Sequence, residues 1–199
     1  MEKNLSRELS LFPLNVNVLP GGYLPLQIFE PRYLDMVKDC MSKEIGFCVV
    51  LIKPSNRSKS ESIDFYKKGT YAEIVDFNQL ENGLLGITVQ GKYRIEVLEE
   101  SVQKDGLRLG RVYELDEEEE SVNLEPSYKN IWNVLEDLSA HPEIQKLELD
   151  INFNDSSNVA YNLASLLPLT PPEKQTILEA STNVEKLDYL DQVLKKLGG

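Results

Sequence analysis

The sequence of 199 residues predicts an α+β protein, with a β-rich part over residues 1–115 and a helical part over residues 127–199. Short apolar stretches follow one another closely in the first part, and apolar residues recur at helical spacing after Pro126. The charge also shifts: residues 1–113 hold fifteen Lys/Arg and fifteen Asp/Glu, whereas residues 114–199 hold six and eighteen. Residues 114–199 thus carry the whole formal charge of −12, and the acidic run at 116–120 predicts a solvated linker over residues 116–126.

The strands of the first part are expected between turn signals. Asn82-Gly83 and Asp105-Gly106 are pairs that favour tight hairpins, and Gly91 marks a bend or a bulge. The purely apolar run Phe47 to Ile52 is typical of a strand buried on both faces. A mixed or antiparallel sheet that curls into a small barrel is therefore expected. Its strands are predicted at 9–19, 24–29, 47–52, 70–77, 84–91, 93–100 and 107–115.

One helix is expected inside the β-rich part, after "LPLQIFEPRY". Pro31 suits a first helical position, and Glu30 would lie at the positive end of the helix dipole. Arg32 could pair with an acid from a neighbouring strand, a partner that the sequence does not reveal. We interpret Glu30, Pro31, Arg32 and Tyr33 as a structural signature of a strand-to-helix turn and not as catalytic groups. The expected apolar positions of this helix are Leu34, Val37, Cys40 and Met41.

Four segments of the second part show helical periodicity. Thr170 with Glu173 and Thr182 with Glu185 have the spacing of capping boxes, each at the start of a helix. The predicted apolar faces are Ile131, Trp132, Leu135 and Leu138; Val159, Leu163, Leu166 and Leu167; and Leu187, Leu190, Leu194 and Leu197. A helical bundle is expected here.

The motifs that suggest chemistry are incomplete. "GITVQGKY", Gly86 to Tyr93, has phosphate-loop spacing, but Tyr93 replaces the required Ser or Thr and the stretch favours extended backbone. Asp150 to Tyr161 resembles a calcium loop without its glycine and closing glutamate. The single histidine, His141, fits a capping or surface role. We therefore predict no catalytic residues, no metal site and no cofactor.

The composition bears on location and partners. No apolar run approaches the ~20 residues of a membrane helix, and the N-terminus lacks a signal-peptide block. Two cysteines, Cys40 and Cys48, fit a reducing compartment, so a cytoplasmic protein without a membrane partner is expected. The acidic second part argues against nucleic acid.

In several stretches the sequence resembles the N-terminal domain of the Lon protease family. The resemblance lies in "LFPLNVNVLPGGYLPLQIFEPRYLDMV" and continues through "GFCVVLI", "GTYAEIVDF", "LLGITVQGKYRIEVL" and "LASLLPLTPPEKQTILEAS". Leu19 stands where the family often has phenylalanine. The resemblance implies a PUA-like pseudobarrel followed by helices, and a role in recognising protein substrates. It also implies a stand-alone member without the family's ATPase and Ser–Lys peptidase domains, and so not an enzyme.

Three functional hypotheses follow. The first is a module that binds polypeptide segments in proteolysis or quality control, by strand addition or in an apolar groove. Its candidate contacts are Tyr23, Phe29, Tyr66 and Tyr71, each of which also fits a core or ordinary surface position. The second is a small carboxylate-dependent enzyme, and the third is an RNA-binding PUA-like protein. The sequence leaves the partner, the binding surface and the oligomeric state open.

Overall fold

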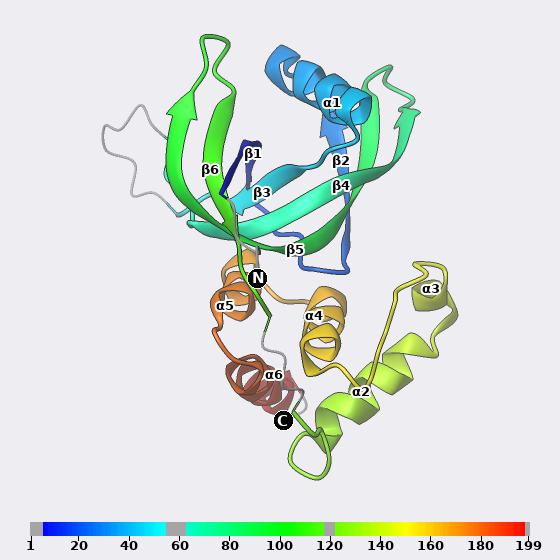
Figure 1. Cartoon of the computed structure of the whole chain (residues 1–199). Helices are drawn as coiled ribbons and strands as arrows, with labels where there is room; N and C mark the ends of the chain where they lie inside the picture. The colour runs from blue at the N-terminus through cyan, green and yellow to red at the C-terminus, as the bar shows by residue number, and fades with distance from the viewer. Residues whose placement is uncertain (1–5, 55–62, 118–121, 198–199) are drawn as a thin grey trace. The chain divides into compact units, whose positions relative to one another are not determined.

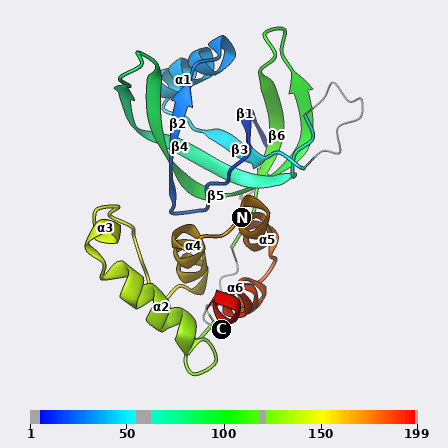
Figure 2. The same ribbon diagram turned by 180° about the vertical axis from the view of Figure 1, so that it is seen from behind.

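Two compact units make up the chain, residues 1–115 and residues 116–199 (Figures 1 and 2). The computed structural model describes residues 6–54, 63–117 and 122–197. A mixed sheet and helices confirm the predicted α+β class. The elements are β1 (Arg7–Leu14), β2 (Tyr23–Ile28), α1 (Pro31–Lys43), β3 (Phe47–Leu51), β4 (Lys68–Gln79), β5 (Leu85–Val102), β6 (Arg108–Glu114), α2 (Lys129–Ser139), α3 (Pro142–Gln145), α4 (Ser156–Leu166), α5 (Pro171–Glu179) and α6 (Asn183–Leu197).

The sheet of the first unit has the strand order β2-β5-β4-β3-β1-β6, and β5 also pairs with β6. This second pairing closes the sheet on itself. Neighbouring strands are antiparallel except β1 and β3, which are parallel. A parallel pair needs a long crossover, and here the connection contains β2 and α1. α1 thereby lies between the β4–β5 and β5–β6 hairpins (Figures 1 and 2).

Strand β5 is one continuous strand, whereas the sequence predicted two, at 84–91 and 93–100. Its first half pairs with β2 and β4, and its second half pairs with β4 and β6. Gly91 lies inside it because the chain passes there closely: a Cβ at this position would lie 2.4 Å from the carbonyl oxygen of Leu19. The phosphate-loop spacing from Gly86 to Tyr93 thus falls on extended backbone, as predicted.

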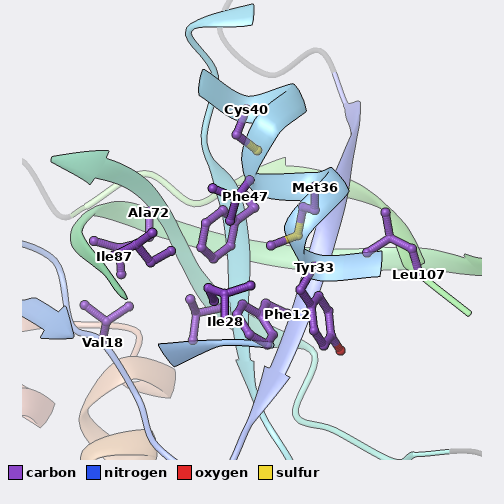
Figure 3. Close-up of a cluster of buried hydrophobic side chains, with 13 residues drawn as sticks. Phe12, Val18, Ile28, Tyr33, Met36, Cys40, Phe47, Ala72, Ile87 and Leu107 are labelled. Atoms are coloured by element: carbon purple, nitrogen blue, oxygen red, sulfur yellow. The ribbon is translucent and has the colours of Figure 1, made fainter. Parts of the chain in front are cut away.

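Helix α1 covers one face of the sheet and completes a core there. In Figure 3, Met36 and Cys40 of α1 lie over Phe47 of β3. The ring of Tyr33 stacks on Phe12 with 4.1 Å between the ring centroids. The predicted apolar stripe was partly wrong: Val37 and Cys40 are buried, but Leu34 and Met41 are 38% and 41% exposed. Tyr33 and Met36 take the inward positions, which rotates the other two towards solvent.

The strand-to-helix turn has the predicted start at Pro31, with Glu30 at the N-cap. Arg32 pairs with Glu30 and not with an acid of a neighbouring strand. Its guanidinium pairs with Glu30 at 2.6 Å and donates to the carbonyl oxygen of Gly106 at 2.9 Å. It also lies 4.7 Å from the centre of the Tyr33 ring. Arg32 therefore ties the start of α1 to the turn between β5 and β6.

In the second unit the predicted helices and both capping boxes are present. The backbone N–H of Thr170 donates to Glu173 at 2.8 Å, and that of Glu185 donates to the Thr182 hydroxyl at 3.2 Å. The stripe on α6 differs at its end, where Leu197 is 56% exposed in the last turn. The short helix α3 was not predicted, and His141 caps it by accepting from the N–H of Glu143. Among the residues that the structure describes, no helix has the length and apolar character needed to span a bilayer.

Candidate functional site

A groove of about 380 Å³ opens in the first unit between the end of α1 and strand β4. We call it the α1–β4 groove; it is lined by Cys40, Met41, Glu44, Ile45 and Glu73–Phe77. Four of its apolar side chains are strongly exposed: Met41 and Ile45 at 41%, Val75 at 47% and Phe77 at 57%. Its size lies within the range of about 300–1,000 Å³ that is typical of ligand pockets. The groove can thus receive apolar side chains of a partner.

A β-bulge determines which side chains face the groove. Ile74 pairs with Val89 and Asp76 with Thr88, so Val75 is an extra residue without a partner in β5. Directly paired residues share a face of the sheet. Phe77 pairs with Ile87, which belongs to the same buried cluster as Val89 and α1, so Phe77 and Ile74 lie on the face that α1 covers. Without the bulge, Phe77 would lie on the opposite face from Ile74.

The charged residues in the lining are all acidic: Glu44, Glu73 and Asp76. Glu73 is paired with Lys92, with 3.5 Å between the charged atoms, while both side chains stay partly exposed. The thiol of Cys40 also borders the groove, but burial and the nearby Asp39 carboxylate raise its pKa to about 11. The groove therefore combines apolar contact surface with negative charge and offers no reactive thiolate at neutral pH.

The backbone at the end of α1 shapes one wall. Glu44 ends the helix in the left-handed conformation, with a φ of 53°, and its N–H donates to the carbonyl oxygen of Cys40. Glycine or asparagine is usual at such a position, because a Cβ there is strained. A glutamate is therefore held in an unfavourable conformation at the rim of the groove.

A second groove of about 350 Å³ lies on the other side of α1, against β1 and β6. Its lining mixes acids with Lys38 and Lys43 and contains few exposed apolar side chains. It lacks the single sign of charge and the apolar floor of the α1–β4 groove. The α1–β4 groove is the better candidate for a binding site.

The second unit contains a buried polar group that we call the Lys186 cluster: Lys186, Glu117, Ser157, Asn183 and Tyr161. The Lys186 ammonium, which is fully buried, pairs with Glu117 and donates to Ser157 at 3.1 Å and to Asn183 at 3.4 Å. The Tyr161 hydroxyl donates to the other oxygen of Glu117 at 2.8 Å. Glu117 belongs to the acidic run for which a solvated linker was predicted, yet it is half-buried and ion-paired.

The pairing of Ser157 with Lys186 does not make a nucleophile. A lysine ammonium has three donors, and three acceptors surround this one. The Ser157 hydroxyl donates to Asn183, so its proton is directed away from the lysine. Nucleophilic catalysis needs a neutral base that receives the hydroxyl proton. The cluster is therefore built to hold helices together. Within residues 6–54, 63–117 and 122–197, no three His, Cys, Asp or Glu side chains gather as they would around a metal ion.

The four aromatic residues predicted as contacts are not brought together. Tyr71 is 4% exposed, stacks on Tyr93 and accepts a hydrogen bond from the N–H of Gly46, so it takes the core position that the sequence also allowed. Tyr66 is half-buried beneath Lys53. Tyr23 and Phe29 are 39% and 63% exposed at opposite ends of β2, and neither lines the groove.

The residues that form the groove were missed in the sequence. Strict alternation along "TYAEIVDF" would put Phe77 and Ile74 on opposite faces of the sheet. Nothing in the sequence indicates the bulge at Val75. One signal was present. The apolar residues of α1 and the following turn occupy more of the helix surface than one buried stripe needs, and the surplus includes Met41 and Ile45.

Comparison with known proteins gives one family. The model of the ATP-dependent protease La (LON) substrate-binding domain matches residues 8–196. The Lon protease of Syntrophomonas wolfei is 29% identical over an alignment of 202 positions, which covers 98% of this chain and 24% of that protein. Protein cereblon of Gallus gallus is 34% identical over 105 residues, 51% of this chain and 22% of that protein. The chain thus spans only about a quarter of the length of these curated relatives.

Among solved structures, the chain is similar to the Lon N-terminal domain protein from Xanthomonas campestris. The TM-score is 0.71 at 28% sequence identity, and the similarity covers 95% of this chain and 98% of that one. Both units are thus included in the match.

Proposed function

Because the chain belongs to the substrate-binding domain family of ATP-dependent protease La (LON), we propose that it is a non-catalytic module that binds segments of other polypeptides in the α1–β4 groove. The family match covers residues 8–196 and includes no other domain. One observation carries the choice of surface: four exposed apolar side chains gather around a groove that has a strand at its side.

We also propose a finer description of the fold, as a pseudobarrel followed by a helical bundle. Closure of the sheet by the β5–β6 pairing supports a PUA-like pseudobarrel for residues 1–115. Four helices that each bury side chains, α2, α4, α5 and α6, support a helical bundle over residues 127–199. In the acidic connection that the sequence predicts over residues 116–126, Glu117 is anchored to α6 by the ion pair with Lys186.

Apolar contact in an open groove suits a partner that varies in sequence. Burial of apolar surface contributes roughly 25 cal/mol per Å² and has no directional requirement. An open groove also orders a bound chain at an entropic cost, so micromolar affinity, on the order of 8 kcal/mol, is expected. Methionine adds adaptability because its side chain is flexible and polarisable, and Met41 lies in the lining.

The test is an array of immobilised decapeptides that vary in apolar and charged content, probed with the labelled 199-residue chain. Peptides with several apolar residues should be retained. Phe77→Ala removes the largest exposed side chain of the groove and should weaken binding about tenfold, as expected for a central aromatic contact.

Phe29→Ala is the matched control, because Phe29 is 63% exposed but does not line the groove. It should leave binding within about twofold of the parent chain. Retention of no peptide would overturn the proposed function. Equal losses in the two variants would overturn the assignment to this groove.

A further inference from the structure

We infer that the bound segment joins the sheet as an extra strand along the open edge of β4, residues 73–79, and that it alternates apolar with basic residues. The inference rests on the proposed function and specifies the mode of binding and the chemical class of the segment. It uses the backbone of β4 in addition to the side chains of the α1–β4 groove.

The second half of β4 has only one neighbouring strand among the described residues. β3 pairs with Thr70, Tyr71 and Ala72, and its pairing stops there. Residues 73–79 pair with β5 alone. Residues 75–79 are all exposed, although their partners in β5 include the buried Ile87 and Gly86. One side of this strand therefore presents unpaired N–H and C=O groups to solvent.

The path of the chain explains why no described strand pairs with residues 73–79 on this side of β4. β3 begins at Phe47, opposite Ala72, and the residues before it turn away towards α1 through Glu44 and Gly46. The crossing is so tight that a Cβ on Gly46 would lie 2.1 Å from the carbonyl oxygen of Ala72. The residues just before β3 therefore do not continue its pairing along residues 73–79. They form a wall of the groove instead. An added strand would take the position that β3 leaves.

The two faces of this edge differ in chemistry. Ile74 and Phe77 lie on the face that α1 covers, next to Met41 and Ile45. Glu73 pairs with Gln90 and Asp76 with Thr88, which places both acids on the opposite face. Side chains of an added strand also alternate between faces. The complementary segment is therefore apolar at one set of alternate positions and basic at the other.

The charges favour a basic segment over a second copy of this edge. Two copies paired edge to edge would bring Glu73 and Asp76 of one chain close to the same acids of the other. Like charges placed opposite each other on a sheet are destabilising. A lysine or arginine beside Asp76 gains attraction instead, and Lys92 offsets the charge of Glu73 only partly. About six residues of a segment, some 20 Å, can lie along residues 73–79.

The experiment uses the full 199-residue chain and a fluorescein-labelled peptide with the sequence Lys-Val-Lys-Phe-Lys-Val-Lys-Phe-Lys, followed by fluorescence anisotropy. Two further peptides carry N-methyl groups on alternate backbone nitrogens, one on the odd set and one on the even set. Strand addition uses every second N–H of the added chain. One methylated peptide should bind at least tenfold more weakly, while the other should stay within about threefold of the parent peptide.

The outcomes separate this inference from the proposed function. Unequal effects of the two methylated sets support strand addition. If both methylated peptides bind as tightly as the parent, and Phe77→Ala still weakens binding, strand addition is overturned and the groove proposal stands. If the peptide fails to bind and the decapeptide array is also silent, both proposals are overturned.

A separate experiment tests whether the bound segment must be basic. A peptide with glutamate in place of every lysine should bind at least tenfold more weakly at low salt, and added salt should narrow the difference. Asp76→Lys should weaken the lysine peptide several-fold. Glu136→Lys, an exposed change of the same sign on α2, should leave binding unchanged. Equal affinity for the two peptides would overturn the basic class of the segment.

Discussion

The Lys186 cluster and the α1–β4 groove distribute polar and apolar groups in opposite ways. The cluster buries an ammonium and satisfies it with three acceptors, so its polar groups are inside and partnered. The groove exposes four large apolar side chains beside a half-paired strand. In this protein the polar groups that look chemically reactive are buried and paired within the fold, and large apolar side chains of the kind usual in a core are exposed at the groove.

Different physical costs explain the contrast. A buried charge is tolerated only when its partners are in place, so removing one partner is strongly destabilising. An exposed apolar side chain costs the folded state little, because it is also exposed when the chain is unfolded. Substitutions in the cluster should therefore change stability and leave binding alone, and substitutions of the exposed apolar side chains of the groove should do the reverse.

The largest expected effect is that of Lys186→Ala. Losing the ammonium leaves Glu117 half-buried without its ion pair, and the free energy of unfolding of the helical unit should fall by about 3 kcal/mol. Trp132, the single tryptophan, lies in α2 and its ring packs at a tilt against Phe153, so tryptophan fluorescence during urea unfolding reports this unit. Peptide binding by the native protein should not change.

Lys195→Ala is the control for this loss. Lys195 forms an ion pair with Asp191 on the same helix, but its side chain is 71% exposed. Its removal should cost less than about 0.5 kcal/mol. A comparable cost for both lysines would show that the Lys186 cluster does not stabilise the unit.

The next effect concerns the start of α1. Arg32→Ala removes the ion pair with Glu30 and the hydrogen bond to Gly106, and should destabilise the first unit by about 1.5 kcal/mol. Cys40 and Cys48 are both buried in this unit, so the rate of thiol modification under urea measures its unfolding. Lys43→Ala, on the same helix with a 61% exposed side chain, should change stability by less than about 0.5 kcal/mol. Equal effects would argue against an anchoring role for Arg32.

Stability of the first unit should also depend on alkaline pH. Burial raises the pKa of Cys48 from 9.0 to about 12. Above pH 9 the unfolded thiol loses its proton while the folded one keeps it, so stability is complete below pH 9 and falls as the pH rises towards 12. Cys48 should contribute a loss of about 1.4 kcal/mol at pH 10, to which Cys40, whose pKa is also raised, adds. Urea titrations at pH 8, 9 and 10 measure it, and Cys48→Ala should lessen the slope; an unchanged slope would exclude this thiol as the cause.

Much of the fold was predictable because local patterns determine it. Pro31, the two capping boxes and the Asn-Gly and Asp-Gly turns act over a few residues, and each appears as predicted. The register of the strands was not predictable in the same way. β5 continues through Gly91, where the backbone of Leu19 passes close to the strand. This contact joins residues far apart in the sequence.

The groove depends entirely on such distant relations. Phe77 faces α1 only because of the bulge at Val75, and Met41 is exposed only because Tyr33 and Met36 take the inward positions. The sequence suggested aromatic residues as contacts because large apolar groups dominate interfaces. It could not tell that Tyr71 would be buried against Tyr93.

The smallest expected effects are those of substitutions at Glu44, which separate a change in stability from a change in binding. Glu44 has a φ of 53°, a conformation that glycine adopts without strain, so Glu44→Gly should stabilise the first unit by about 0.5 kcal/mol. The same change removes a carboxylate from the groove and should weaken binding of the lysine peptide about threefold at low salt. Thiol modification under urea and anisotropy measure the two quantities on one sample. Glu44→Gln separates the causes, because it removes the charge and keeps the strained Cβ. It should match the binding loss without the gain in stability, and full affinity in both variants would exclude Glu44 from the recognition of basic segments.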